Sequence, residues 1–231
     1  MKLMHPLFSN PIAFRESCIP VLVLENPLAF RKLTAELIRQ SECGEGQFVL
    51  SQRDMPLDCA SHLNVLLDFI HVETVDKRIQ TKAINSLLRR AQEMLTQETC
   101  RFTLILQEYL GKLANLAEFP VDYDHSENLS ALLKAMDFRI DLGGMPSCEA
   151  LYEQLALLHR LSKDQCFVLV NAKSFFSSEE LAQLYQMTQY LKMHLLMLES
   201  HASNPIHPFE NVILFDADLC ELHLDSTDEI G

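Results

Sequence analysis

Short, uninterrupted apolar runs occur near both ends of the chain. They cover residues 19–24, 167–170, 195–198 and 212–215, and a shorter run covers 48–50. A continuous apolar run of roughly 4–8 residues is typical of a strand that is covered on both faces, as in a parallel sheet. We therefore predict a buried sheet to which both ends of the chain contribute strands.

Signals for helix starts lie between these runs. Asn26 and Pro27 follow the first run and suit the N-cap and the first turn of a helix. Ser147 is placed to cap a second helix, and Ser177 with Glu180 has the spacing of a capping box that opens a third. Strands that alternate with helices predict a parallel sheet with right-handed crossovers.

The middle of the chain has a helical pattern throughout. Four apolar residues have the spacing of a short amphipathic helix: Leu63, Leu66, Leu67 and Ile70. Residues 74–119 contain no proline and one glycine, and their apolar positions repeat at helical spacing. This stretch is much longer than a typical globular helix, so it predicts a projecting arm or one helix bent near its middle. A further helix is expected at 129–136.

These elements predict an α/β fold with two domains. A parallel-sheet head comprises residues 1–58 and 144–231, and an all-α arm at 59–143 is inserted into it. The 231 residues are 48% hydrophobic and 22% charged, which is enough for one large ordered domain or two small ones.

Several features indicate the compartment. No apolar run approaches the roughly 20 residues of a membrane span, and Pro6 precedes any apolar core of a signal peptide. The seven cysteines are scattered and form no C-x-x-C pair, which favours reduced thiols. We expect a cytoplasmic protein without membrane association.

The glycines form no phosphate-binding loop. The turn after the first strand is Glu25-Asn26-Pro27, and neither G-x-x-x-x-G-K-[ST] nor G-x-G-x-x-G occurs in the chain. The G-x-S-x-G motif of serine hydrolases is also absent. We expect no ATP binding at this turn and assign no catalytic residue.

Acidic residues gather around one turn between predicted helices. They are Asp122, Asp124, Glu127, Asp137 and Asp141. Hard oxygen ligands in a flexible turn suit Ca²⁺ better than a softer metal, although the sixth and twelfth positions from Asp122 are not those of an EF-hand. The alternative is a solvated acidic turn that joins two helices.

The formal net charge of −13 opposes nucleic-acid binding, unless the acidic residues lie away from a local basic strip or cations neutralise them. Basic residues are in fact unevenly placed. Lys77, Arg78 and Lys82 lie on the predicted long helix, and Lys134 and Arg139 lie close to the acidic turn. They are candidate contacts to phosphates, and the alternative is a solvated helical face.

Several short segments also have an informative order and spacing. They are Pro11-Ile12, Val21-Leu22-Val23-Leu24-Glu25, Val121-Asp122-Tyr123-Asp124, Leu132-Leu133-Lys134, Phe167-Val168-Leu169-Val170-Asn171 with Phe175 and Phe176, and Leu196-Met197-Leu198-Glu199. In this arrangement the chain resembles the Csn-two family of type II-A CRISPR systems. The resemblance covers nearly the whole chain, to about Leu224.

The resemblance implies more than the residues do alone. It implies a head like a degenerate P-loop NTPase core with a long helical leg and no ATPase activity. It also implies a Ca²⁺-stabilised homotetrameric ring that threads onto double-stranded DNA from its ends. Such a ring supports spacer acquisition alongside the CRISPR integrase and the effector nuclease. By position, Asp122, Asp124 and Asp141 match acidic residues of the family and Lys134 matches a basic one, while Glu127 and Asp137 lie nearby.

Three hypotheses follow. The first is a non-catalytic ring that binds DNA ends, with calcium as a structural cofactor. The second is a nucleotide-dependent enzyme on a P-loop-like fold. The third is a protein-interaction scaffold whose acidic face engages basic partners.

Overall fold

The chain forms two compact units. A computed structural model describes residues 1–69, 71, 77–123, 129–162 and 164–224, with the backbone alone at 77 and 78. The head unit comprises Met1–Thr74 and Leu142–Gly231, and the helical unit comprises Val75–Asp141. The first segment of the head was predicted to end at residue 58 and instead ends at residue 74, 16 residues later. It is longer because residues 63–66 form a strand in the sheet of the head.

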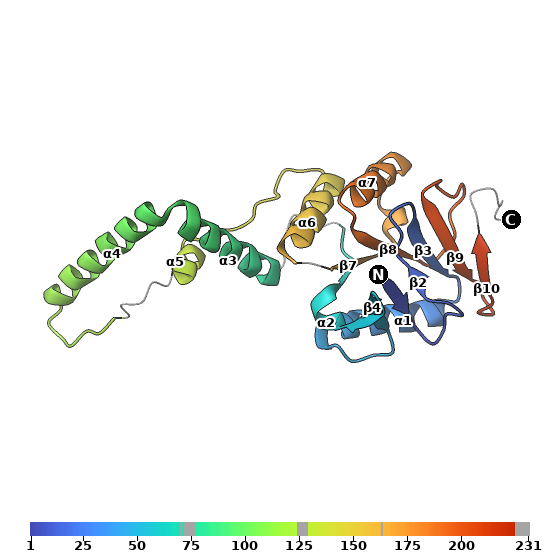
Figure 1. Cartoon of the computed structure of the whole chain (residues 1–231), viewed down its shortest axis with the longest axis horizontal. Coiled ribbons are helices and arrows are strands. Elements are labelled where there is room, and N and C mark those ends of the chain that lie inside the picture. Colours follow the sequence, from blue (N-terminus) through green and yellow to red (C-terminus); the bar gives the residue numbers. More distant parts are fainter. Residues whose placement is uncertain (70, 72–76, 124–128, 163, 225–231) are drawn as a thin grey trace. The chain divides into compact units, whose positions relative to one another are not determined.

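A six-stranded sheet forms the centre of the head unit (Figure 1). Neighbouring strands are parallel, except that the last strand of the chain pairs antiparallel with β9. Their order is β10 (Glu221–Leu224), β9 (Glu210–Phe215), β3 (Ile19–Leu24), β8 (His194–Glu199), β7 (Cys166–Val170) and β6 (Leu63–Leu66). The four buried strands expected from apolar runs are confirmed, and the sheet as a whole is mixed.

One predicted helix is wrong. The leucines at 63, 66 and 67 suggested a helix, but α2 covers only Cys59–His62 and is followed by β6, where Leu63 pairs with Cys166 of β7. Leu63 is 4% exposed and Val65 packs on the same core, so alternate residues face inward. Four apolar residues fit either period, and the long-range pairing with β7 decides between them.

Helices of the head begin at local caps. Asn26 caps α1 (Pro27–Cys43), and the capping box of Ser177 and Glu180 opens α7 (Ser178–Tyr190), as predicted. The cap predicted at Ser147 is wrong. Pro146 occupies the N-cap position of α6 (Ser147–Leu161), and no side chain caps that end.

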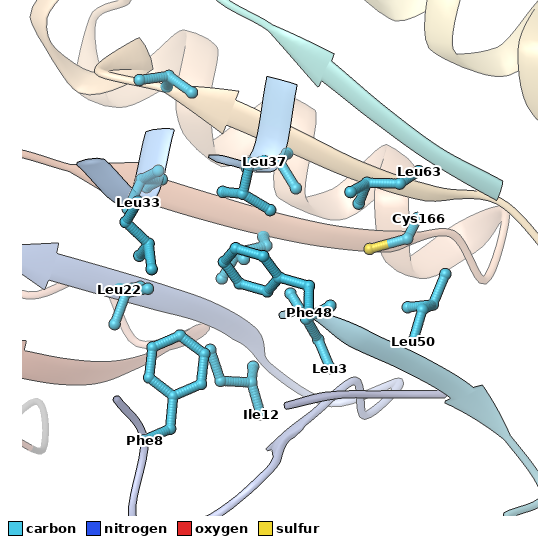
Figure 2. Packing of buried hydrophobic residues seen from close by; sticks show 14 of the residues in the cluster. Leu3, Phe8, Ile12, Leu22, Leu33, Leu37, Phe48, Leu50, Leu63 and Cys166 are labelled. Carbon is cyan, nitrogen blue, oxygen red and sulfur yellow. The ribbon is translucent and has the colours of Figure 1, made fainter. Parts of the chain in front are cut away.

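A second, antiparallel sheet has the order β2 (Ile12–Ala13), β1 (Lys2–Met4), β4 (Val49–Gln52) and β5 (Met55–Leu57). The strand expected at 48–50 corresponds to β4. The core lies between this sheet, α1 and the six-stranded sheet, and Figure 2 shows Leu3, Leu22, Leu37, Phe48 and Cys166 within it. Strands of two or three residues carry too few positions for a periodic signal, so β1 and β2 were not predicted.

The described elements of the helical unit are α3 (Lys77–Met94), α4 (Thr96–Leu116) and α5 (Leu129–Ala135). The predicted long helix is interrupted at Leu95, whose φ and ψ are −123° and 34°, so the alternative of a helix bent near its middle is confirmed. The helix expected at 129–136 is also confirmed. No helix in the described ranges is long and apolar enough to span a bilayer.

Candidate nucleic-acid interface

Charge is divided unequally between the two units. The helical unit holds nine of the 19 Lys and Arg residues and ten of the 32 Asp and Glu residues, which gives it a formal charge of −1. The head unit holds the other ten basic and 22 acidic residues, a formal charge of −12. The helical unit is therefore close to neutral, and nearly all of the excess acid lies elsewhere.

Helix α3 gathers basic positions on one side. The basic positions 78, 82 and 89 share a helical face with the polar Asn85, because the four positions are separated by four, three and four residues. Lys82, Asn85 and Arg89 are exposed on it, and Arg78 belongs to it by position. At 1.5 Å per residue, Arg78 and Lys82 are about 6 Å apart along the helix axis, and Lys82 and Arg89 about 10 Å. Lys77 lies about 100° around the helix from Arg78.

Helix α5 adds Lys134 to the same region. The Ser130 hydroxyl lies 3.5 Å from the amide oxygen of Asn85, and α5 packs against α3. Lys134 is one turn beyond Ser130 on α5, just as Arg89 is one turn beyond Asn85 on α3. We call the exposed Lys82, Asn85 and Arg89 of α3, together with Lys134 of α5, the basic face.

The end of α5 explains the conformation of Asp137 and the place of Lys134. Asp137 has a φ of 51°; its N–H donates to the carbonyl of Lys134 at 3.1 Å and the N–H of Phe138 donates to that of Leu133 at 2.9 Å. This is a Schellman ending with Asp137 as its left-handed residue. The last turn of a helix favours a cation, which suits Lys134.

Asp137 and Arg139 bind one another. The guanidinium of Arg139 donates to the Asp137 carboxylate at 2.9 Å, and both side chains are mostly exposed, at 63% and 76%. A predicted DNA contact and a predicted calcium ligand are thus paired. An exposed pair of this kind contributes about 0–1 kcal/mol, so another ligand can displace either partner.

The other predicted calcium ligands are exposed or outside the described residues. Asp122 accepts the N–H of Tyr123 at 2.9 Å and is exposed, as is Asp141. Asp124 and Glu127 lie outside the described residues. Within the described part of the chain, no three His, Cys, Asp or Glu side chains are grouped to hold a metal ion. The described carboxylates of Asp122, Asp137 and Asp141 offer the hard oxygens that Ca²⁺ prefers, and the calcium site stays a prediction.

Comparison with protein families gives a match over most of the chain. The sequence model of the family described as CRISPR-associated protein (Cas_Csn2) matches residues 40–219, more than three quarters of the chain. The chain belongs to the Cas_Csn2 family. The resemblance predicted from short segments is confirmed, and the match includes the whole helical unit together with strands β4 to β9 of this Cas_Csn2 protein.

The start of α1 is the place in this Cas_Csn2 protein where a phosphate loop would lie. The side-chain oxygen of Asn26 accepts the N–H groups of Leu28 and Ala29 at 3.0 and 3.1 Å, and its amide nitrogen donates to the carbonyl of Ala217 at 2.8 Å. Free N–H groups at a helix start are what a phosphate binds. Two of them are already used by the cap.

The helical unit also exposes apolar surface that the sequence pattern could not place. One face of α4 carries residues that are 44–79% exposed: Phe102, Ile105, Tyr109, Leu113 and Leu116. A groove of about 530 Å³ lies between α3 and the end of α5, where Leu87, Leu88 and Ala91 face Leu133 and Phe138. We call the first of these the α4 apolar face. The helical period in the sequence predicted an apolar side of this helix, but not that the single chain leaves it uncovered.

Proposed function

We propose that this Cas_Csn2 protein is a non-catalytic, cytoplasmic binder of double-stranded DNA ends that supports CRISPR spacer acquisition. In this proposal it acts as a calcium-stabilised homotetrameric ring alongside the CRISPR integrase and the effector nuclease, and its head is a degenerate P-loop-like core. Family membership supports the CRISPR role. The observation that carries DNA binding is the basic face on a unit of formal charge −1 in a chain of −13.

The proposed contacts are to phosphates. Lys82, Arg89 and Lys134 are exposed on the basic face, and Arg78 extends it toward the start of α3 by position. Lys77 is a further proposed contact on an adjacent side of the same helix. Contacts of this kind carry no sequence information and weaken steeply with salt. The protein is therefore expected to bind duplexes of unrelated sequence alike.

Calcium has two proposed effects on this surface. It neutralises carboxylates among Asp122, Asp124, Glu127, Asp137 and Asp141, which lowers their repulsion of phosphates. It also competes with Arg139 for Asp137, because these two side chains are paired at 2.9 Å. The guanidinium released from this pair is then available to a phosphate, so calcium and DNA binding strengthen each other.

Self-association is supported by the exposed apolar surface. The α4 apolar face presents five large side chains along four turns, and monomeric proteins rarely leave such a continuous patch in water. A second copy of the chain is the proposed cover. Repetition around a ring would gather several basic faces and produce a local positive field despite the acidic total.

The test compares linear duplex with closed circular plasmid, each in calcium and in chelator. Binding to the linear form alone, lost in chelator, is the expected result. Equal binding to both forms would eliminate threading from ends. A triple variant of the basic face, Lys82→Gln with Arg89→Gln and Lys134→Gln, should weaken binding, whereas the matched head variant Lys2→Gln with Arg31→Gln and Lys32→Gln should not.

A second candidate function is a protein-interaction scaffold, because the head unit carries a formal charge of −12. Such a surface attracts basic partners. This function predicts no DNA affinity at physiological salt and unchanged partner binding when the predicted calcium ligands are replaced by alanine. The nucleotide-dependent enzyme is the least supported alternative, since Asn26 occupies the start of α1. A thermal shift with ATP would support this alternative.

A further inference from the structure

A cluster of buried charged side chains joins the end of β8 to the start of β9, within the head unit. Glu199 is the last residue of β8 and is 3% exposed, and Glu210 is the first residue of β9 and is 8% exposed. Lys173, in the short helix η1 (Ala172–Ser174), bonds to both. Its N–H donates to Glu199 Oε1 at 3.2 Å, and its Nζ lies 2.8 Å from the Glu210 carboxylate. Two buried carboxyl groups therefore share one ammonium group.

The hydrogen bonds distinguish the two carboxyl groups. Glu210 accepts from Lys173 Nζ, from the Tyr185 hydroxyl at 2.7 Å and from the N–H of His207 at 3.3 Å, and these bonds favour its ionised form. Glu199 accepts from the backbone of η1. A buried carboxyl group without a cation of its own favours the neutral form. The cluster is therefore balanced when Glu210 is ionised and Glu199 is protonated.

The loop that connects β8 to β9 is attached to this cluster. We call residues 200–209 the strap. The Ser203 hydroxyl of the strap accepts a hydrogen bond from Lys173 Nζ at 2.9 Å, and the N–H of His207 donates to Glu210 at 3.3 Å. Both attachments are made to the charged groups of the cluster, so a change in the charge of the cluster acts directly on the strap.

The strap has few other contacts with the core. Of its ten residues only Ile206 is buried. At its start, the N–H of Ser200 donates to the side chain of Asn171 at 2.9 Å. A segment with so little buried apolar surface opens at a low free energy, well below that of global unfolding. The polar attachments to the cluster therefore decide how often the strap opens.

We infer that the strap is a pH-dependent switch, which stays closed while Glu199 is protonated and opens more often once that proton is lost. Ionisation of Glu199 would place a second negative charge near Glu210, and the ammonium of Lys173 cannot balance both. Burial of an unbalanced charge is costly, and opening of the strap relieves it by admitting water. The switch is independent of the proposed DNA binding, because it belongs to the head unit alone.

The titratable groups of the neighbouring elements set the pH range of the switch. Burial raises the pKa of Glu199 to about 7; Lys173 of η1 acts in the opposite direction, and Glu210 of β9 adds to the increase. Burial also raises the pKa of Tyr185 on α7, so its hydroxyl remains a donor to Glu210. His207 of the strap is the other titratable side chain at the cluster, since its ring packs against that of Tyr185 with centroids 5.3 Å apart. The experiment must therefore separate Glu199 from His207.

The sign and the size of the effect follow from the two states of Glu199. Its pKa is about 7 in the closed state and returns to its ordinary value of 4.5 when the open strap admits water. Between these values the closed state holds a proton that the open state has released, so opening becomes easier as pH rises. From pH 5.5 to 7.5 the opening equilibrium should increase roughly 20-fold.

The test measures amide hydrogen exchange of the full chain at several pH values from 5.5 to 7.5. Rates are expressed as protection factors, which remove the intrinsic effect of pH on exchange. Protection of the strap amides should fall roughly 20-fold over this range. Amides of β5, an edge strand of the other sheet, are the internal control and should change little. Glu199→Gln keeps an acceptor for the N–H of Lys173 but cannot ionise, so its strap should stay protected throughout.

Two further variants separate the switch from its attachments. Ser203→Ala removes one attachment, so it should lower protection of the strap at every pH and keep the pH dependence. His207→Asn removes the other titratable side chain and should also keep it. Constant protection of the strap in the unmodified protein would overturn the proposal, as would an unchanged pH dependence in Glu199→Gln. Loss of the pH dependence in His207→Asn would overturn the assignment to Glu199.

Discussion

A buried ion pair in the head unit provides the sharpest stability prediction. Lys173 Nζ lies 2.8 Å from the Glu210 carboxylate and also donates to the Ser203 hydroxyl at 2.9 Å. The same carboxylate accepts the Tyr185 hydroxyl at 2.7 Å and the N–H of His207 at 3.3 Å. The side chains of Lys173 and Glu210 are only 12% and 2% exposed. Neither charge can therefore return to water when the other is removed.

Lys173→Met leaves Glu210 buried without its cation. Breaking a buried pair in this way costs about 3–5 kcal/mol, whereas replacing both charges together costs far less. The double variant Lys173→Met with Glu210→Gln removes both charges and keeps one acceptor oxygen for the Tyr185 hydroxyl, although not a second one for the N–H of His207, so it should recover much of the loss. Lys2→Met, which breaks an exposed pair with Asp54 at 3.0 Å, should change the free energy of unfolding by less than about 1 kcal/mol.

Urea denaturation followed by tyrosine fluorescence measures all of these free energies of unfolding. A loss below about 1 kcal/mol for Lys173→Met would refute the argument, because it would mean that solvent reaches Glu210. A double variant no more stable than the single one would refute it equally, since burial of an unpaired charge would then not be the cause.

Three further predictions concern the head unit. Burial raises the pKa of Glu199 to about 7, although Lys173 acts in the opposite direction. Between about pH 4.5 and 7 the folded state therefore holds a proton that the unfolded state has released. The free energy of unfolding falls as pH rises through this range. Glu199→Gln should flatten this part of the stability–pH curve, and an unchanged slope would contradict the assignment. Asn26→Ala removes the cap of α1 and should cost about 1 kcal/mol in chemical denaturation, without creating ATP binding. Leu37→Ala, at a position with 0% exposure, should cost about 2–5 kcal/mol, and a smaller loss would indicate a core that collapses around the cavity.

The salt dependence of DNA binding follows from the basic face. Each phosphate contact that is removed lowers the slope of log K against log salt by about 0.9. The triple variant of Lys82, Arg89 and Lys134 should therefore have a shallower slope as well as a lower affinity. A parallel shift with the original slope would mean that these residues act through folding and not through phosphates.

Local sequence determined much of the fold. The four buried strands were predictable because each is a continuous apolar run flanked by breakers, and the capping box at Ser177 because its two bonds join residues three apart. The missing phosphate loop was predictable for the same reason, since Asn26 and Pro27 select a capped helix over a glycine-rich turn. Family membership was also predictable from the order of short segments.

Tertiary structure decided the remainder. Leu63 joined a strand because β7 was available to pair with it, and no local period could show that. The basic face spans two helices only because Ser130 of α5 meets Asn85 of α3, across 45 residues of sequence. Periodicity records what each residue requires of its near neighbours, whereas burial, strand pairing and assembled surfaces depend on which distant segments fold against them.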